Sequence, residues 1–302
     1  MHIPDGFLST PVWLALDATG LPAIALLARR ARRELEEART PLLGVMGAFV
    51  FAAQMINFPV AAGTSAHLVG GALLAIALGP AAATVVMTAI LTVQAFVFQD
   101  GGILALGANV FNMAIAGVLA AWLPYRLWGR GAHRRAAIFA AGALSVMVSA
   151  LLAVSELVAS RVPVSRAALA FLLVVFGISA VVEGAITVAV VRAIERLSPR
   201  VIRQGGTEPS WVLALCGAGA VLLAGAGGLV ASTNPDGLQW LGGQLDILGR
   251  ITNVFTAPLA DYRARWLGSP WAAKAAAGSA GALLVGLICV ALGRAAARPR
   301  SA

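Results

Sequence analysis

The sequence is poor in charged residues. Only 12% of its 302 residues are Asp, Glu, Lys or Arg, against roughly 25% in a typical soluble domain. Apolar residues make up 60% of the chain, and long apolar runs recur along its whole length. A membrane-spanning helix needs about 20 such residues. The composition excludes an ordinary soluble domain and predicts an all-α, polytopic membrane helix bundle in contact with the lipid bilayer.

The signatures of several other protein classes are missing. The two cysteines, Cys216 and Cys289, lie far apart in apolar segments, which argues against a disulfide scaffold or a thiolate metal site. The chain has no Gly-x-x-x-x-Gly-Lys-Ser/Thr phosphate loop, no His-Glu-x-x-His and no Gly-x-Ser-x-Gly. We therefore expect no ATP hydrolysis and no enzymatic activity from this chain, and no organic cofactor. The arginines behind the net charge of +9 lack interleaved aromatic residues, so nucleic acid is not an expected partner.

The apolar segments predict how the chain is organised. The first 200 residues are expected to form a core of about seven spans, and residues 210–302 an accessory domain with two spans around an outer loop. Between them lies a polar linker, Ser198 to Ser210. The third segment is short and Gly79-Pro80 separates it from the fourth, so it is either a steep span or a re-entrant piece. The segments are 11–28, 41–60, 65–79, 81–98, 103–124, 136–159, 167–191, 210–231 and 272–293.

The basic residues predict the orientation. With nine spans, 16 of the 22 Lys and Arg residues fall on one side of the membrane, which the positive-inside rule makes cytoplasmic. The amino terminus is then outside and the carboxyl terminus inside, in a cell inner (plasma) membrane. The loops at 29–39 and 126–135 are both basic, so an even number of crossings separates them. Four crossings place residues 61–64 in an outer turn, and two crossings would also fit.

The first two residues, Met1 and His2, can chelate a metal ion. A free terminal amine, the amide nitrogen of His2 and the His2 imidazole suit Ni(II) or Cu(II) in a square plane, and Co(II) less specifically. Residues 1–10 carry no Lys or Arg, so no secretory signal peptide is indicated and the start of the chain is expected to be retained. His2 is too large a neighbour for routine removal of Met1.

His67 lies in an apolar segment, where a histidine is costly and is a functional candidate by default. The predicted topology places it on the same side of the membrane as His2, so His67 could supply a fourth nitrogen. The third histidine, His133, is expected to be a solvated loop residue. A metal-bound imidazole needs partners that orient it. The candidates for that task, each also a plausible interhelical hydrogen-bonding residue, are Asn57, Thr64, Ser65, Asn109 and Asn112.

Two acidic residues leave another function open. Glu156 and Glu183 lie in or near the sixth and seventh apolar segments. They could relay protons in a proton-coupled secondary transporter, or could pair with arginines near the ends of the spans. Asp5 is expected to take a structural turn role, and Gln99 and Asp100 to belong to a loop.

Four stretches of the first half resemble the CbiM/NikM family, the substrate-binding membrane subunits of energy-coupling-factor importers for cobalt and nickel. They are Met1 to Leu8, Gln54 to Pro59, Gly63 to Gly71 and Phe98 to Asn109. The segment Asn234-Pro-Asp-Gly-Leu-Gln-Trp240 is similar to the PDGLE-type accessory domain of the small CbiN/NikN component. Gln239 departs from that pattern, which has Glu.

The resemblance implies a substrate-binding component of an ATP-driven importer that captures Ni(II) or Co(II) on the outer side. Its ligands would be the amine of Met1, the amide and imidazole of His2, and the imidazole of His67. Its partners would be a transmembrane coupling subunit and cytoplasmic ATPase subunits. The sequence leaves the choice between nickel and cobalt open, together with the oligomeric state and the route of the ion.

Overall fold

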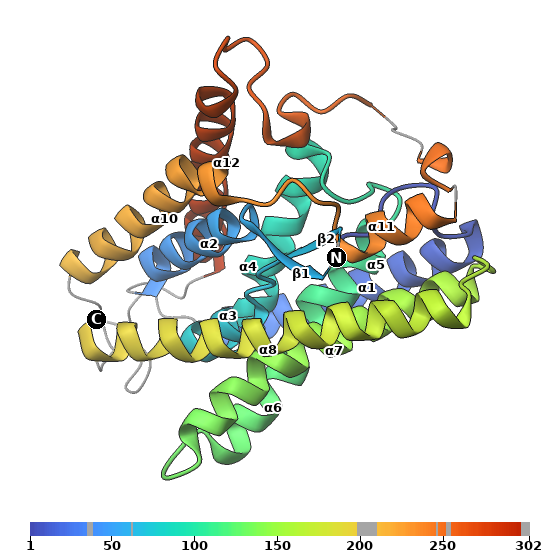
Figure 1. Ribbon diagram of the computed structural model, residues 1–302. Coiled ribbons are helices and arrows are strands. Elements are labelled where there is room, and N and C mark those ends of the chain that lie inside the picture. Colours follow the sequence, from blue (N-terminus) through green and yellow to red (C-terminus); the bar gives the residue numbers. More distant parts are fainter. Residues whose placement is uncertain (35–38, 62, 198–209, 246, 252–254, 297–302) are drawn as a thin grey trace.

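The computed structural model describes residues 1–34, 39–61, 63–197, 210–245, 247–251 and 255–296 (Figure 1). Within them, seven helical segments are long and apolar enough to cross a membrane. Five fall in the first 200 residues and two after residue 210, so the predicted polytopic helix bundle is confirmed. The seven segments are Thr10–Arg33, Pro80–Phe98, Leu106–Trp128, Arg134–Ala159, Arg166–Leu197, Trp211–Val230 and Pro270–Ala296.

These segments correspond to the long helices of the bundle. Two of them are composite, because a π-helical stretch continues α4 as η2, and another, η3, joins α5 to α6. Stretches of π-helix are rare and often accompany functional sites. The elements are α1 (Thr10–Glu34), α4 (Pro80–Val93), η2 (Gln94–Phe98), α5 (Leu106–Asn109), η3 (Val110–Gly117), α6 (Val118–Trp128), α7 (Arg134–Ala159), α8 (Arg166–Leu197), α10 (Ser210–Val230) and α12 (Pro270–Ala296).

Two predicted segments have a different structure from the one expected. In the place of 41–60 stands α2 (Thr40–Gln54), followed by strand β1 (Asn57–Ala61). In the place of 65–79 stands strand β2 (Thr64–His67), followed by α3 (Gly71–Leu78), whose eight residues are all buried. A helix of this length is too short to span a bilayer, so the third segment is a short helix inside the bundle.

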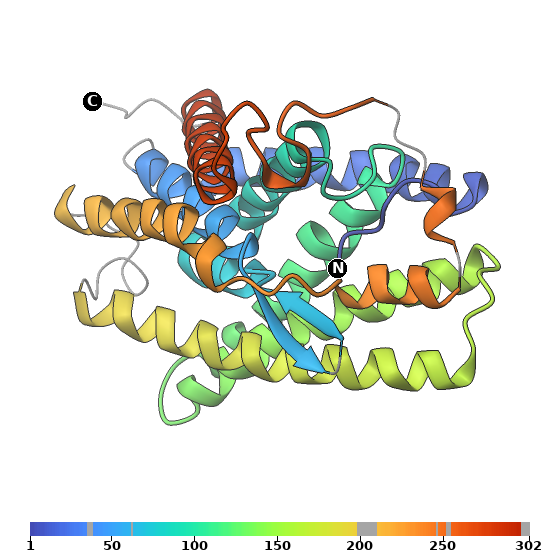
Figure 2. The same cartoon turned by 45° about the horizontal axis from the view of Figure 1, so that its top comes forward.

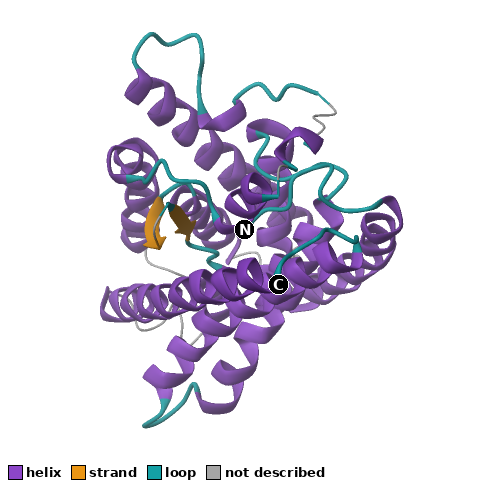
Figure 3. Cartoon of the chain, turned by 45° about the vertical axis from the view of Figure 1, so that its right-hand side comes forward, coloured by secondary structure: helices purple, strands orange, loops and turns teal. Residues whose placement is uncertain are grey.

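Strands β1 and β2 form an antiparallel hairpin, which sits among the helices in Figure 3. Its turn falls at the predicted residues 61–64, where Gly63 adopts a positive φ of 75° that a side chain would strain. Pro59 is accommodated because β1 is an edge strand of this two-stranded hairpin. The hairpin pairs Asn57 with His67 and so ends with the histidine at its base.

The last two long helices pack against the first half of the chain. Helices α10 and α12 both lie along α2 (Figure 1). The α2–α12 contact depends on glycine: a Cβ added at Gly44 would meet Val290 Cγ2 at 2.5 Å and the Gly286 carbonyl oxygen at 2.9 Å. Small residues at such crossings let helix backbones approach closely in lipid.

The segment between α10 and α12 returns to the amino terminus. It contains α11 (Gly237–Gln244) and two short 3-10 helices, η4 (Leu248–Arg250) and η5 (Ala260–Tyr262). Figure 2 shows the start of the chain in the interior of the molecule, beside β2 and the beginning of α11. Residues 235 positions apart in the sequence therefore meet there.

The α2–α12 contact can be tested by filling it. Gly44→Val places two methyl groups where Val290 and the main chain of Gly286 already stand, and overpacking of this kind costs about 1–3 kcal/mol. We expect a lower melting temperature for the detergent-solubilised variant. Gly217→Val in α10 is the matched control, because an added Cβ there meets nothing within 4 Å. Equal melting temperatures for the two variants would contradict the close approach.

Candidate metal site

The first residues of the chain are buried and held by main-chain hydrogen bonds. Ile3 is bound on both its polar groups: its N–H donates to Asn109 Oδ1 at 2.8 Å, and its carbonyl accepts from Asn109 Nδ2 at 3.0 Å and from Gly102 N at 2.9 Å. Met1 and His2 are only 7% and 5% exposed. The terminus is thus a fixed part of the interior, in keeping with the rule that buried main-chain polar groups are hydrogen-bonded.

Asp5 fastens the next part of the same segment. Its two carboxylate oxygens accept hydrogen bonds from the main-chain N–H groups of Ile103 and Ala105, at 2.9 and 3.1 Å. Close approach is possible because Gly102 has no side chain; a Cβ there would lie 2.1 Å from Asp5 Oδ1. Asp5 therefore holds the 102–105 loop against the terminus, which is a structural role.

The terminal amine lies between a histidine and a carboxylate. Met1 N is 3.0 Å from His67 Nε2 and 2.6 Å from Asp236 Oδ2. His67 Nδ1 lies 2.9 Å from the carbonyl oxygen of Leu68, which can only accept a hydrogen bond and so places the ring proton on Nδ1. The lone pair of Nε2 then faces the amine. A carbonyl that orients an imidazole in this way is common behind metal-binding histidines.

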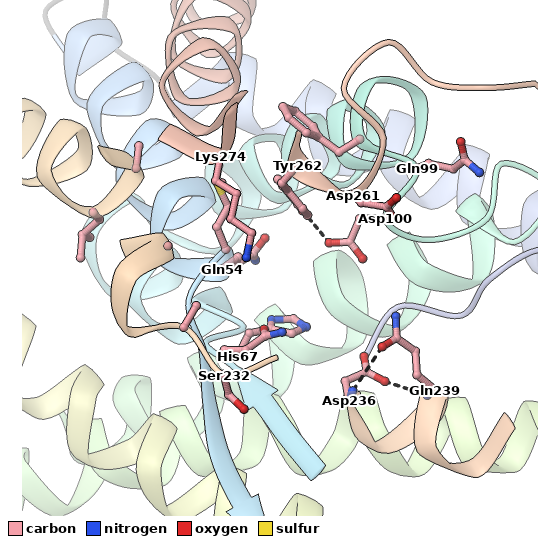
Figure 4. A pocket seen from close by; sticks show the side chains of 17 residues that line it. Gln54, His67, Gln99, Asp100, Ser232, Asp236, Gln239, Asp261, Tyr262 and Lys274 are labelled. Atoms are coloured by element: carbon pink, nitrogen blue, oxygen red, sulfur yellow. Dashed lines mark hydrogen bonds between the residues drawn. The ribbon is translucent and has the colours of Figure 1, made fainter. Parts of the chain in front are cut away.

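His2 stacks on His67 and contacts a second carboxylate. The two rings are nearly parallel, with centroids 5.1 Å apart and an interplanar angle of 9°. His2 Nδ1 lies 3.2 Å from Asp100 Oδ1, while the buried Nε2 has no hydrogen-bond partner among the described residues. The other oxygen of Asp100 accepts from the Tyr262 hydroxyl at 2.5 Å (Figure 4). Asp100 follows the end of η2, where Gln99 adopts a left-handed main-chain conformation with a φ of 57°.

The electrostatics keep His67 neutral. Burial, the positive terminal amine and His2 lower the pKa of His67 to about 3, so its Nε2 lone pair is available at neutral pH. Burial acts to raise the pKa of Asp100, but the charge and hydrogen bond of His2 lower it further than burial raises it. Burial acts in the same way on Asp236, whose pKa nevertheless falls below its usual value beside the terminal amine. Both carboxylates are therefore negative at neutral pH.

Two small cavities of about 230 Å³ each adjoin the site. One is walled by His67 and the other by His2, and both are lined by Asp100, Asp236 and Asp261. Figure 4 shows the side chains around the first cavity. Each imidazole thus borders a space that an ion could enter, and three carboxylates are among the groups that line it.

The residues predicted to orient the imidazoles make other contacts. Asn109 binds the main chain of Ile3, and Ser65 binds the segment before Asp236 through Ser65 Oγ to the Asn234 carbonyl at 2.6 Å. The main-chain carbonyl of Asn57 accepts from Ser232 N at 2.8 Å, and Thr64 bonds within the hairpin turn. Asn112 donates to Glu156. Among these five residues no side chain bonds an imidazole nitrogen in the described part of the chain.

Besides His67, the amine contacts Asp236 and the His2 ring contacts Asp100, which in turn binds Tyr262; none of these three residues was predicted as a site residue. Asp236, Asp100 and Tyr262 look like turn or loop residues in the sequence. Asp236 caps α11: its Oδ1 accepts from Gln239 N at 2.8 Å, and Gln239 Oε1 accepts from Asp236 N at 3.3 Å. A capping box accepts Gln as well as Glu at this position, so Gln239 keeps the structural role despite departing from the motif.

Within the described residues, no group of three or more His, Cys, Asp or Glu side chains is arranged to hold a metal ion. The ligand set predicted from the sequence contains only two such side chains, His2 and His67. Its other members are main-chain nitrogens, the amine of Met1 and the amide of His2. The arrangement found here brings Met1, His2 and His67 together.

A buried, nitrogen-rich site within an apolar helix bundle is suited to a membrane component that handles metal ions. Comparison with known families agrees with that class. Residues 2–201 match the model of the CbiM family, described as the cobalt uptake substrate-specific transmembrane region, and residues 210–298 match the PDGLE domain. The chain belongs to the CbiM family and carries a PDGLE domain fused to its carboxyl side. It is a multi-pass membrane component of this cobalt and nickel transport family.

Relatives share this arrangement over most of their length. A putative fused nickel transport protein NikMN of Archaeoglobus fulgidus is 38% identical over 296 residues, which cover 94% of this chain and 95% of the relative. A fused nickel transport protein NikMN of Rhodobacter capsulatus is 34% identical, with 77% of this chain and 73% of the relative covered. A crystal structure of a truncated transition metal transporter superposes with a TM-score of 0.58 at 30% identity, covering 65% of this chain and 99% of the transporter.

The lowered pKa of His67 predicts acid destabilisation of the metal-free protein. The folded state keeps His67 neutral, whereas the unfolded chain takes up that proton near pH 6.5. Stability from this residue is therefore complete above pH 6.5 and is lost as the pH falls from there toward 3. At pH 5.5 the loss is about 1 kcal/mol. The measurement is the melting temperature of the detergent-solubilised protein between pH 7.5 and pH 5.

His67→Gln should flatten that pH dependence, because glutamine does not titrate. His133→Gln is the control, since His133 is exposed and belongs to the turn before α7. The two aspartates do not confound the result, because their contribution is lost only below their unfolded pKa of 3.8. If His67→Gln leaves the pH dependence of the melting temperature unchanged, His67 is not the cause of the acid destabilisation.

Proposed function

We propose that this protein is the substrate-binding component of an ATP-driven importer that captures Ni(II) or Co(II) on the outer side of the cell inner (plasma) membrane. The observation that carries the proposal is the meeting of the Met1 amine with His2 and His67 in one buried place. In this proposal the ligands are the amine of Met1, the amide and imidazole of His2, and the imidazole of His67. The nickel and cobalt transport proteins among its relatives support the same class of substrate.

The chemistry of four nitrogens favours a transition-metal ion over the abundant hard cations. Mg(II) and Ca(II) prefer oxygen ligands, whereas Ni(II) gains from a strong square-planar nitrogen field. A chelate formed by the Met1 amine, the His2 amide nitrogen and the His2 imidazole uses Nδ1 of the imidazole. Binding through Nδ1 closes a smaller chelate ring with the metal than binding through Nε2 would. In this structure Nδ1 lies beside Asp100 and the amine beside Asp236. Metal capture then transfers these two nitrogens from their carboxylates to the ion.

The two parts of the chain have separate roles in this proposal. Residues 1–200 form the metal-binding core, and residues 210–302 form the accessory domain. The accessory domain reaches the site at two points, because Asp236 binds the amine and Tyr262 binds Asp100. Through these contacts it holds the dipeptide Met1-His2 before the ion arrives and so assists loading.

The energy for import would come from other subunits. The sequence has no phosphate-binding loop, so we assign ATP hydrolysis to cytoplasmic ATPase subunits that act through a transmembrane coupling subunit, and no enzymatic activity to this chain. The basic loops support an outer amino terminus and a cytoplasmic carboxyl terminus.

Proton-coupled secondary transport gains no support from the two buried glutamates. Both carboxylate oxygens of Glu183 accept main-chain hydrogen bonds, from Val69 N and Gly70 N, each at 2.8 Å. Glu156 accepts from Asn112 at 2.9 Å. Glu183 thus fixes the main chain just beyond His67, which is a structural task.

An extension of the amino terminus tests the proposal most directly. One glycine added before Met1 moves the free amine away and replaces it with an amide, so the chelate loses a ligand. We expect stoichiometric nickel or cobalt binding to disappear, as measured by metal analysis and calorimetry of the purified protein. The control carries the same glycine after Ala302. Full metal stoichiometry in the extended protein would refute the amine as a ligand.

Replacement of the second imidazole gives an independent test. His67→Ala removes one nitrogen of the four while leaving the terminal amine free, so we expect at least a tenfold loss of metal affinity. His133→Ala, on an exposed turn, is the matched control and should bind as the unchanged protein does. A melting temperature measured beside the titration separates lost binding from lost folding. Equal affinities of the two variants would exclude His67 from the site.

A further inference from the structure

A larger cavity lies elsewhere in the molecule, away from the metal-binding residues. It has a volume of about 850 Å³ and opens between the start of α2, the end of α3, helix α6 and the turn into α7. Its charged and aromatic lining consists of four arginines and two aromatic residues: Arg39, Arg126, Arg130, Arg134, Trp122 and Tyr125. No Asp or Glu of the described residues lines it.

Two of the arginines are fixed in place by neighbouring groups. Arg134 donates to the Tyr125 hydroxyl at 3.2 Å, lies over the Tyr125 ring at 5.3 Å and pairs with Glu195. Arg39 donates through Nη2 to the carbonyl oxygen of Ala77 at 3.0 Å. The Nε atoms of both arginines are buried without a hydrogen-bond partner among the described residues. Unused buried donors of this kind call for an acceptor.

The other two arginines carry charge that the described chain does not neutralise. Arg126 and Arg130 are exposed, and neither forms an ion pair with a described carboxylate. Glu195 pairs with Arg134. The cavity therefore presents a concentrated positive field, which favours an anion with several acceptor oxygens, and arginine forks match phosphate oxygens in geometry.

The surface next to the cavity is apolar. On α6, the exposed side chains of Leu119, Leu123 and Leu127 follow one another at intervals of four residues and form a stripe along one face, being 44%, 57% and 57% exposed. Trp128 at the end of the helix is also 55% exposed. Tryptophan and tyrosine concentrate where a membrane meets water. A ligand that fits both surfaces has an anionic head and a long apolar tail.

We propose that this cavity binds an anionic phospholipid, with the headgroup phosphate among Arg39, Arg126 and Arg130 and an acyl chain along the leucine stripe of α6. Basic pockets between transmembrane helices are the usual sites for such headgroups. The stripe favours a lipid over free phosphate, which would use only the arginines. The proposal is independent of the metal site, since none of the cavity residues is a proposed metal ligand.

The test compares ligands and variants by thermal shift in a detergent that carries no charge. The ligands are phosphatidylglycerol, phosphatidylcholine and inorganic phosphate. Arg126→Gln/Arg130→Gln removes two charges from the cavity through exposed side chains. Arg29→Gln/Arg196→Gln is the matched control, because it removes two exposed charges that do not line the cavity. Phosphatidylglycerol should stabilise the unchanged protein and the control, and should bind the cavity variant about thirty-fold more weakly.

Phosphatidylcholine and inorganic phosphate should give little stabilisation. Equal shifts from phosphatidylglycerol in the two double variants would overturn the proposal, as would an equal shift from phosphatidylcholine. A full shift from inorganic phosphate alone would replace the lipid with a small-anion site. If no ligand raises the melting temperature of the protein, the lipid proposal is wrong and the arginines bind another group, such as an acidic segment of a partner protein. Native mass spectrometry of the unchanged protein, with phosphatidylglycerol retained over phosphatidylcholine, gives the answer should the cavity variant fail to fold.

Discussion

The ion pair between the amine of Met1 and the carboxylate of Asp236 is the contact on which the arrangement of the site depends. A charge removed from water needs a charged or strongly hydrogen-bonded partner, and the amine of Met1, a residue only 7% exposed, lies 2.6 Å from Asp236 Oδ2. Burial of the amine draws the first residues into the bundle. His2 then stacks on His67, and the cavities form beside the two rings.

The rest of the structure provides rigid supports for that pair. On the amine side, Asn109 and Gly102 hold Ile3, so the main chain of the terminal segment cannot swing. On the carboxylate side, Ser65 N donates to the Pro235 carbonyl at 2.9 Å and ties the segment before Asp236 to the strand that carries His67. Glu183 fixes the main chain just after that strand. The close packing of α12 on α2 through Gly44 anchors the PDGLE domain to the part of the chain that matches the CbiM family.

The apolar runs and a few conspicuous polar residues in the sequence were sufficient to predict the helix bundle and part of the site. Apolar runs predicted the helical membrane bundle, because burial in lipid demands long apolar helices. His67 stood out because a histidine in an apolar run is costly. The hairpin at 57–67 was missed because the apolar runs on either side of it, 41–60 and 65–79, extend into it, and what makes it a hairpin is the turn at Gly63 and the docking of residues 234–236. Asp100, Asp236 and Tyr262 were missed for a related reason: their contacts with residues 1 and 2 or with one another join distant parts of the chain.

The link between Met1 and Asp236 also fixes the order in which the site can be completed. During synthesis Met1 and His2 emerge first, whereas Asp236 and Tyr262 emerge after the core has been made. For most of the time the ribosome is at work, the amine therefore lacks its counter-ion, and Asp100, which contacts the His2 ring, lacks the Tyr262 hydroxyl. Domains fold as units from the amino terminus onward. Here the residue that is synthesised first, Met1, is among the last to reach its final surroundings. The site is thus a check on completeness, because a chain that stops before residue 236 leaves its own first residue without its counter-ion.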